Sequence, residues 1–232
     1  NLLGIKQLHW FTGQFWANKK FRFLRISYFT DLFINICAFK SFTDGYSQAK
    51  FLKRNLPNIF SKEIFPVPKG SISGVSNELL KIGIDKYKKL LLNKEIIKRK
   101  IRVGFLGRIN RDKGMEIIKN LSKDNDLKND FCFFVAGPNE ENLFIEKNLK
   151  SPPEKCNLII KKGYQDKKEF FNLIDIFILP SKREGFGSVV LESQASGIPV
   201  VCSNIYGLSD SLPLNGGGIH CKNYLDYKEA LL

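Results

Sequence analysis

The sequence predicts an α/β fold: a doubly wound parallel sheet with helices on both faces. From Lys100 onward, apolar runs of strand length alternate with helical stretches. The runs are continuously apolar, as in strands covered on both faces, and about 130 residues is an ordinary size for one such domain. Open α/β sheets bind ligands beyond the carboxyl ends of their strands, so functional residues are expected in the loops there.

The expected strands share a short apolar run bounded by polar residues or glycine. They are Ile101–Leu106, Phe131–Ala136, Leu158–Ile160, Ile174–Leu179, Pro199–Cys202 and Gly218–Cys221. The expected helices lie between those strands. They are Met115–Ser122, Glu140–Leu149, Lys167–Leu173 and Val189–Ser196.

Residues 1–80 are less regular and are interpreted as part of a separate amino-terminal domain. Phe29, Leu32, Phe33 and Ile36 form an i, i+3, i+4, i+7 stripe that predicts a helix. A strand, a helix and an extended segment are expected after it. They are Ala38–Thr43, Gln48–Arg54 and Phe65–Pro68. The Lys-rich residues 81–99 are expected to connect this part to the domain formed by residues 100–232. Because the chain opens at Asn1 rather than Met, we interpret it as part of a longer protein.

Composition excludes several classes of protein. The formal net charge is +14, from 37 basic and 23 acidic residues. Nucleic-acid binding is not favoured, because the lysines are scattered and no nucleic-acid motif is present. No apolar run approaches the ~18 residues of a transmembrane helix. The five cysteines are odd in number and widely spaced, which argues against a zinc site or disulfide framework and favours a reducing compartment.

The segment Lys19–Lys40 is rich in Phe, Lys and Arg and has two interpretations. It could form a basic amphipathic helix at the inner face of an anionic membrane. Alternatively, its Phe stripe packs against the sheet of its own domain. The second interpretation is favoured because core-facing stripes are commoner.

Two loops carry residues suited to an anionic ligand. The first follows strand Ile101–Leu106 and contains Arg108, a planar fork for phosphate oxygens, and Lys113, a compact positive charge. A solvated basic turn is the alternative. The second loop runs from Pro180 into a helix and contains Glu184, with Glu192 about one turn inside that helix. Backbone amides at such a helix start can bind an anion, and a buried Glu192 needs hydrogen-bond partners. The amides at the helix start belong to Gly187, Ser188 and Val189. Gly185 and Gly187, on either side of Phe186, let the backbone approach a ligand closely.

Together, Arg-x4-Lys after one strand and Glu-x7-Glu after a later one resemble the donor domain of family-four retaining glycosyltransferases, which have the GT-B fold. The segments Val135-Ala136-Gly137 and Ala195-Ser196-Gly197-Ile198-Pro199 agree with this resemblance. It covers residues 100–232 and extends weakly upstream. It implies a transferase that moves a sugar from a nucleotide donor, UDP by family habit, to a saccharide or lipid-linked acceptor with retention. The expected setting is bacterial surface-polysaccharide synthesis in the cytoplasm.

The resemblance also implies roles for matching residues. Arg108 and Lys113 would hold the diphosphate, so no metal or other cofactor is expected. Glu184 would orient the donor sugar, and Glu192 would bind the ribose. The amides near Gly187 and Ser188 would also meet the phosphates. Tyr164, in the region Gly163-Tyr164-Gln165, lies where the family's nucleobase usually sits.

One position departs from the family pattern. The family's His slot holds Thr12, with His9 three residues earlier, so either His9 serves that role or this branch lacks it. Asp124-Asn125-Asp126 fits a metal-binding D-x-D pattern, but a solvated turn is the preferred interpretation. Two other functions stay open: a non-catalytic basic module that binds membrane or nucleic acid, and a GT-B sugar-nucleotide epimerase.

Overall fold

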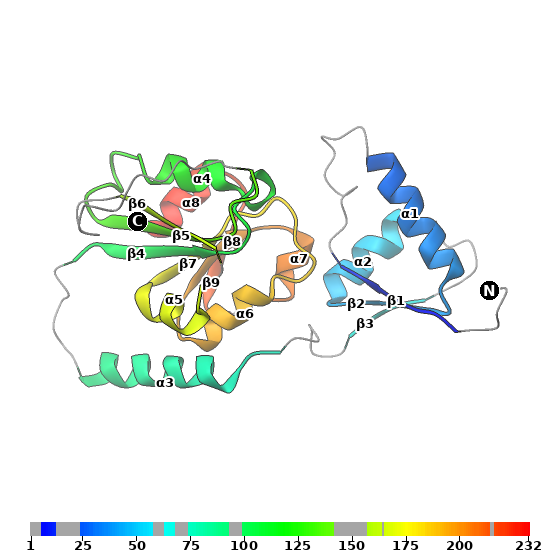
Figure 1. Cartoon of the computed structure of the whole chain (residues 1–232), viewed down its shortest axis with the longest axis horizontal. Helices are drawn as coiled ribbons and strands as arrows, with labels where there is room; N and C mark the ends of the chain where they lie inside the picture. The colour runs from blue at the N-terminus through cyan, green and yellow to red at the C-terminus, as the bar shows by residue number, and fades with distance from the viewer. Residues whose placement is uncertain are drawn as a thin grey trace. The chain divides into compact units, whose positions relative to one another are not determined.

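A computed structural model describes residues 6–12, 24–57, 63–67, 74–92, 99–141, 157–163, 165–213 and 216–232. They form two compact units, each with its own parallel sheet (Figure 1). The first unit comprises Asn1–Gly74, Arg183–Ser188 and Ile205–Pro213. The second comprises Val75–Lys182, Val189–Asn204 and Leu214–Leu232.

The first unit contains a three-stranded parallel sheet in the order β1-β2-β3. Its elements alternate along the chain as β1 (Leu8–Phe11), α1 (Leu24–Cys37), β2 (Lys40–Thr43), α2 (Tyr46–Asn55) and β3 (Ile64–Pro66). A short helix, α7 (Tyr206–Ser209), belongs to the later segment of this unit. The sheet and α2 enclose a small core, which consists of Phe11, Ala49, Leu52, Leu56 and Ile64. The helix, strand and helix predicted between residues 29 and 54 are therefore confirmed, whereas β1 was not predicted.

Helix α1 corrects the preferred interpretation of the Phe stripe. Tyr28 and Leu32 pack against the core, but Phe29 and Phe33 are 62% and 66% exposed among the described residues. The inward face of α1 differs from the predicted one. Tyr28, one position before the stripe, lies four residues from Leu32, so these two side chains share the face that meets the core. The two phenylalanines thus do not pack on the sheet of their own unit.

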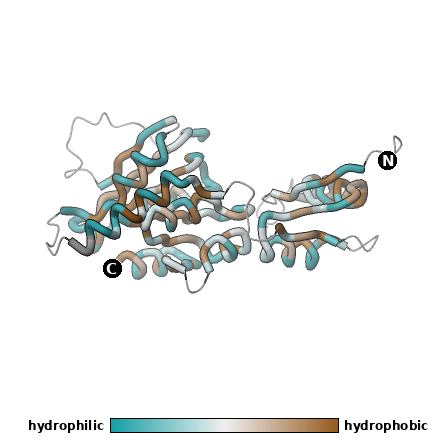
Figure 2. The backbone as a smooth tube through the Cα atoms, turned by 90° about the horizontal axis from the view of Figure 1, so that it is seen from below, coloured by the Kyte–Doolittle hydropathy of each residue, from teal (hydrophilic) through white to brown (hydrophobic). Residues whose placement is uncertain are grey.

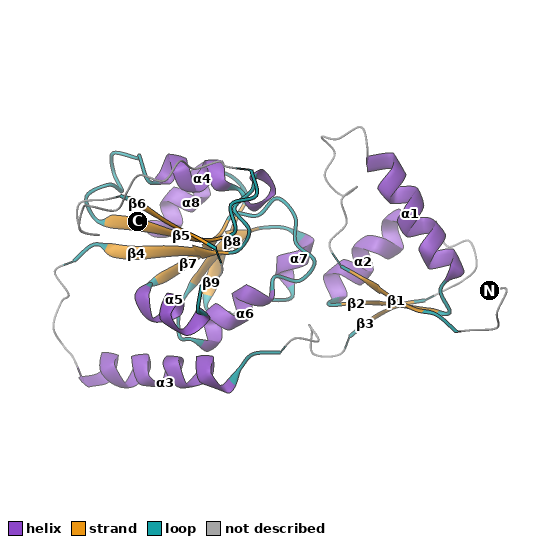
Figure 3. Ribbon diagram, in the orientation of Figure 1, coloured by secondary structure: helices purple, strands orange, loops and turns teal. Residues whose placement is uncertain are grey.

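The second unit is built on a six-stranded parallel sheet in the order β6-β5-β4-β7-β8-β9, drawn in orange in Figure 3. The strands are β4 (Ile101–Leu106), β5 (Phe131–Gly137), β6 (Leu158–Lys162), β7 (Ile176–Leu179), β8 (Val200–Ser203) and β9 (Gly218–Cys221). Every residue of β5 is buried, and the tube in Figure 2 shows hydrophobic colour through the interior of this unit. The predicted doubly wound parallel sheet is therefore confirmed.

Helices cover both faces of this sheet. In Figure 1, α4 and α8 lie on one face and α5 and α6 on the other. The helices are α4 (Met115–Leu121), α5 (Lys167–Leu173), α6 (Ser188–Ala195) and α8 (Tyr224–Leu231), and a 3-10 turn, η2 (Arg111–Lys113), precedes α4. Most of the predicted helix Glu140–Leu149 lies outside the described residues.

Most residues of the expected connecting segment, up to Leu92, belong to a helix, α3 (Asn77–Leu92). Leu79 and Ile82 are buried on its inner face, and the Lys86 ammonium donates to the Phe171 and Ile174 carbonyls at 2.7 and 3.0 Å. Gly83 lies so close to α6 that a β-carbon there would be 2.4 Å from the Ala195 carbonyl oxygen. The helix therefore packs against α5 and α6 through a narrow apolar face, which the many surrounding lysines obscure in the sequence.

Strand β7 begins two residues later than predicted, because Asp175 lies before the strand and binds Arg99 and the Arg102 backbone. Its carboxylate accepts hydrogen bonds from both terminal nitrogens of Arg99, at 2.7 and 2.8 Å, and from the Arg102 backbone N–H at 2.8 Å. Burial acts to raise the Asp175 pKa, but these bonds outweigh it and hold the pKa below its usual value. The residue ties the start of β4 to the start of β7.

The D-x-D segment forms a turn, as predicted, but only half of it is solvated. The Asp124 side chain is 12% exposed and the Asp126 side chain is 65% exposed. Asp124 accepts from the Tyr224 hydroxyl and pairs with Lys228 at 3.1 Å. The Tyr224 bond is the main cause that lowers the Asp124 pKa to about 2. The first aspartate therefore fastens α8 to this turn.

Candidate nucleotide-sugar site

The order of strands in the second unit creates a topological switch point between β4 and β7. From β4 the chain moves outward to β5 and β6, and it then returns to the other side of β4 as β7. The carboxyl ends of β4 and β7 are neighbours, because these strands pair in parallel through Val103 with Ile176 and Gly104 with Phe177. Ligands of open α/β sheets bind in the crevice at such a point.

The loop after β4 is held there by its own polar groups. The Asn110 side-chain oxygen accepts from the Lys113 N–H at 3.1 Å, which closes the 3-10 turn. Gly114 follows in the left-handed conformation, with φ 71°, and α4 begins at the next residue. This cap fixes Lys113 at the entrance of α4, seven residues after the end of β4.

The loops after β4 and β7 are in direct contact. The Lys182 N–H donates to the Asp112 carbonyl at 2.7 Å. A β-carbon on Gly114 would lie 1.9 Å from the Pro180 carbonyl oxygen, so only glycine fits between the two backbones. The position of Lys113 is therefore coupled to the loop that leads into the second predicted motif.

Arg108 lies on the same loop as Lys113 and points to a carboxylate. Its side chain is 57% exposed, and one guanidinium nitrogen lies 3.4 Å from Glu140 Oε1. The Asn110 amide donates to the other oxygen of Glu140 at 2.8 Å. This amide bond and then the positive charge of Arg108 lower the pKa of Glu140. An exposed ion pair of this length is weak, so Arg108 can exchange Glu140 for a stronger anion at small cost.

Glu192 lies on α6 and is 7% exposed. Its Oε1 accepts from the Lys167 ammonium at 2.7 Å. Its Oε2 is buried and has no hydrogen-bond partner among the described residues. Buried polar atoms of this kind normally have a partner, so Oε2 indicates a place where a ligand hydroxyl can donate.

Glycines also shape the stretch from Glu184 to Ser188. A β-carbon on Gly207, in α7, would lie 1.9 Å from the Glu184 carbonyl oxygen, so α7 supports the backbone of this loop at close range. Phe186 is 6% exposed, and Gly187 has a φ of 69° immediately before α6 begins. The turn therefore delivers Ser188 and Val189 to the first positions of α6.

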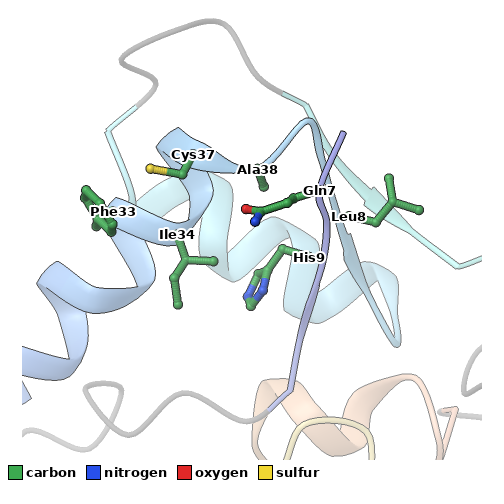
Figure 4. Close-up of a pocket in the computed structure, with 7 residues that line it drawn as sticks. All are labelled: Gln7, Leu8, His9, Phe33, Ile34, Cys37 and Ala38. Atoms are coloured by element: carbon green, nitrogen blue, oxygen red, sulfur yellow. The ribbon is translucent and has the colours of Figure 1, made fainter. Parts of the chain in front are cut away.

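His9 lies on β1 in the first unit, away from either loop in sequence. It borders a pocket of about 480 Å³, where Gln7 and His9 point toward α1 and Leu8 points to the other side (Figure 4). Its ring meets Phe11 edge to face, with centroids 4.4 Å apart. Burial lowers the His9 pKa, and the negative charge of Asp31 opposes that shift. The imidazole is thus biased towards its neutral form, which can accept a proton.

The structure brings Arg108 and Lys113 onto one loop and gives Glu192 a buried position. Tyr164 lies outside the described residues. Sequence reasoning missed Asn110, Glu140 and Lys167, which hold the predicted residues in place. Asn110 could have been found, because a polar residue three positions before Lys113 is a helix-cap signal. The bond from Lys167 to Glu192 has no corresponding signal in the sequence.

Other kinds of site find no support in the described part of the chain. Among those residues, no group of three or more His, Cys, Asp or Glu side chains is placed to hold a metal ion. Cys132, Cys202 and Cys221 are buried, and all three lie in strands. Burial also raises the pKa of the Cys202 and Cys221 thiols to about 12. No described helix combines the length and hydrophobicity that crossing a bilayer requires.

A topological switch point with an Arg and Lys loop, a glycine turn at a helix start and a buried carboxylate is typical of a nucleotide-binding α/β domain. The chain matches the family described as "Glycosyl transferases group 1" over residues 88–231. It belongs to that family.

The relatives in sequence include enzymes named for surface-polysaccharide synthesis. The chain is 32% identical over 156 residues to the capsular polysaccharide biosynthesis glycosyltransferase CapM of Staphylococcus aureus, covering 63% of this chain and 38% of that protein. It is 30% identical over 106 residues to the O-antigen biosynthesis glycosyltransferase WclY of Escherichia coli, covering 45% of this chain and 29% of that protein. The match spans well under half of each relative.

Solved structures show the same fold across nearly the whole chain. Sucrose-phosphate synthase from Thermosynechococcus elongatus superimposes with a TM-score of 0.69 at 15% identity, covering 97% of this chain and 57% of that one. HepE of Anabaena, solved with UDP and glucose, gives a TM-score of 0.64 at 13% identity, covering 97% and 60%. The predicted GT-B type α/β fold is confirmed.

Proposed function

We propose that this chain contains the donor site of a glycosyltransferase that moves a sugar from a nucleoside-diphosphate donor, UDP-linked, to a saccharide or lipid-linked acceptor. The observation that supports it most is the pairing of a cationic loop with a buried, unsatisfied carboxylate oxygen around the switch point. Arg108 and Lys113 suit a diphosphate, and Glu192 Oε2 suits a sugar hydroxyl. Relatives named for capsule and O-antigen synthesis support a role in bacterial surface-polysaccharide assembly, and we place that role in the cytoplasm.

Each predicted residue has a part in this proposal. Arg108 and Lys113 bind the two phosphates and stabilise the negative charge that develops on the leaving diphosphate. The backbone amides of Gly187, just before α6, and of Ser188 and Val189, its first two residues, add neutral donors to the same anion. Glu184 orients the donor sugar through its hydroxyls, and Glu192 holds the ribose.

The acceptor side of the proposal is carried by the first unit. Retention places the acceptor on the face that the diphosphate leaves, so the diphosphate itself can receive the acceptor proton. His9, whose pKa is lowered by burial, is the candidate for contact with the transferred sugar or acceptor. No metal or other cofactor is required, because Arg108 and Lys113 supply positive charge at the phosphates.

Calorimetric titration of the folded chain with UDP, GDP and ADP in EDTA tests the donor site. We expect UDP to bind without metal and more tightly than the other two. Titration of UDP over a range of salt concentrations should retain binding, since Glu192 and the helix amides recognise uncharged or oriented groups. Equal, weak and salt-sensitive binding of all three nucleotides would instead support the basic-module alternative.

We also propose that α1 rests on the anionic inner face of a bacterial membrane. Ile26, Phe29 and Phe33 expose an apolar stripe at a helical spacing, and each is more than 60% exposed. Phe39, 50% exposed, follows the helix beside Lys40. Apolar side chains next to lysine are suited to lipid tails and anionic headgroups respectively.

Sedimentation with vesicles that contain phosphatidylglycerol tests this surface. We expect F29S/F33S to reduce the bound fraction several-fold, because the variant loses the two aromatic side chains that would insert into the lipid on binding. L80S, which changes an exposed leucine on α3, is the matched control and should bind as the unaltered chain does. If F29S/F33S binds the vesicles as well as L80S does, α1 is not the membrane-binding surface.

A further inference from the structure

The ion pair between Lys167 and Glu192 joins the start of α5 to the middle of α6, on one face of the sheet. Lys167 is the first residue of α5, and Glu192 is the fifth residue of α6. Both helices lie on the same side of the sheet in Figure 1. The ammonium and carboxylate are 2.7 Å apart, and the side chains are 55% and 10% exposed. One partner therefore reaches in from solvent to a carboxylate that is almost fully enclosed.

The two oxygens of Glu192 have different surroundings. Oε1 receives the Lys167 bond, whereas Oε2 is buried with no partner among the described residues. A buried carboxylate oxygen without a donor is costly. Since Lys167 already balances the charge of Glu192, the missing partner is a neutral donor such as a hydroxyl.

Lys167 is itself anchored by the cap of α5. The Asp166 side chain accepts from the Lys168 and Glu169 N–H groups at 2.7 and 3.2 Å. This cap fixes the first turn of α5, so the ammonium reaches Glu192 from a defined backbone position. A single bond from that direction restricts how the carboxylate plane can turn, and so determines where Oε2 points.

The charge of Lys167 also matters for a diphosphate ligand. In the proposed donor site, a lone buried carboxylate would repel the phosphates. Pairing with Lys167 cancels that charge and leaves the acceptor capacity of Oε2 intact. The arrangement suits a ligand that is anionic at one end and carries a hydroxyl pair at the other.

We propose that Lys167 is a positioning residue that presents Glu192 Oε2 to the ribose hydroxyls of the donor nucleotide and so makes the site select ribonucleotides over 2′-deoxyribonucleotides. This inference rests on the proposed donor function, and it assigns a role to a residue outside the predicted motifs. Lys167 does not touch the ligand; it acts through Glu192.

Calorimetric titration with UDP and 2′-deoxy-UDP tests the proposal on the whole chain and its variants. The unaltered chain should prefer UDP by about tenfold or more, the effect of one lost hydrogen bond to a charged acceptor. K167M should lower that preference towards unity, and K167R should restore most of it. K168M is the matched control, because Lys168 is the next residue and pairs with the exposed Glu78 at 2.7 Å. It should leave the preference unchanged.

The outcomes separate this inference from the proposed function. If the unaltered chain binds neither nucleotide, the proposed function fails and the inference fails with it. If the unaltered chain prefers UDP and K167M keeps that preference, only the role of Lys167 is overturned. Tighter binding of both nucleotides by K167M would also overturn it, since Lys167 would then be a competitor for Glu192. Circular dichroism checks folding, and K167Q replaces K167M if the methionine variant does not fold.

Discussion

Replacing Lys113 with alanine should lower sugar transfer by about 10²- to 10³-fold, the usual cost of removing one preorganised group that stabilises charge in a transition state. Lys113 is held at the entrance of α4 by the Asn110 cap, in the loop that follows β4 at the switch point between β4 and β7. Its charge is expected to act mainly on the leaving diphosphate, so kcat should fall more than the affinity for the donor. The measurement is steady-state transfer by the complete enzyme with a UDP-sugar.

A nearby lysine provides the control. Lys119 lies in the last turn of α4 and is exposed, so Lys119→Ala makes the same change of charge six residues away. It should retain nearly full activity. If Lys113→Ala also transfers sugar at the normal rate, or if both variants lose activity equally, the site does not depend on this loop.

Replacing Gly114 with alanine should destabilise the second unit by about 3 kcal/mol or more and abolish nucleotide binding. Two effects add at this position. A non-glycine residue at positive φ costs of order 1–3 kcal/mol, and here the new β-carbon would lie 1.9 Å from the Pro180 carbonyl oxygen. Relief of that clash must separate the loops after β4 and β7, which displaces Lys113. Chemical denaturation and UDP titration measure the two consequences.

Two other glycines separate the causes. Gly163 has a φ of 86° with nothing within 4 Å of a new β-carbon, so Gly163→Ala reports the conformational cost alone. Gly217 has no such φ and no close neighbour, so Gly217→Ala should be nearly neutral. The largest loss is expected for Gly114→Ala. A loss no greater than that of Gly163→Ala would mean that the contact between the loops yields easily.

The sheet of the second unit could be predicted from sequence because its strands are buried on both faces. Continuous runs such as Phe131–Gly137 have no other ordinary explanation at that length. Helix α3 was missed because its buried face is narrow and its outer face carries many lysines. Strand β1 was missed because His9 interrupts its apolar run and only Phe11 of its four residues is buried, so it lacks the continuous apolar pattern of the other strands.

The candidate site was predictable to the extent that its residues follow strand ends in fixed motifs. Arg108, Lys113 and Glu192 belong to this group. The residues that hold them do not, because their partners are distant in the chain: Lys167 is 25 residues from Glu192, and Glu140 is 30 from Asn110. The exposure of Phe29 and Phe33 could not be predicted either. Helical spacing shows which residues share a face of the helix, but it does not show whether that face packs against the core or is exposed.

The strand order of the second unit also governs how this unit is made. Strand β4 is synthesised first and lies in the middle of the finished sheet, where it pairs with β5 on one side and β7 on the other. The β5 edge can form early, but the β7 edge waits until residue 176 has left the ribosome. In the meantime an apolar strand edge stands open, which is the kind of surface that pairs with other chains. Newly made chains should therefore be most prone to aggregate in the interval before β7 emerges, and non-local parallel pairing of this kind is slow to form.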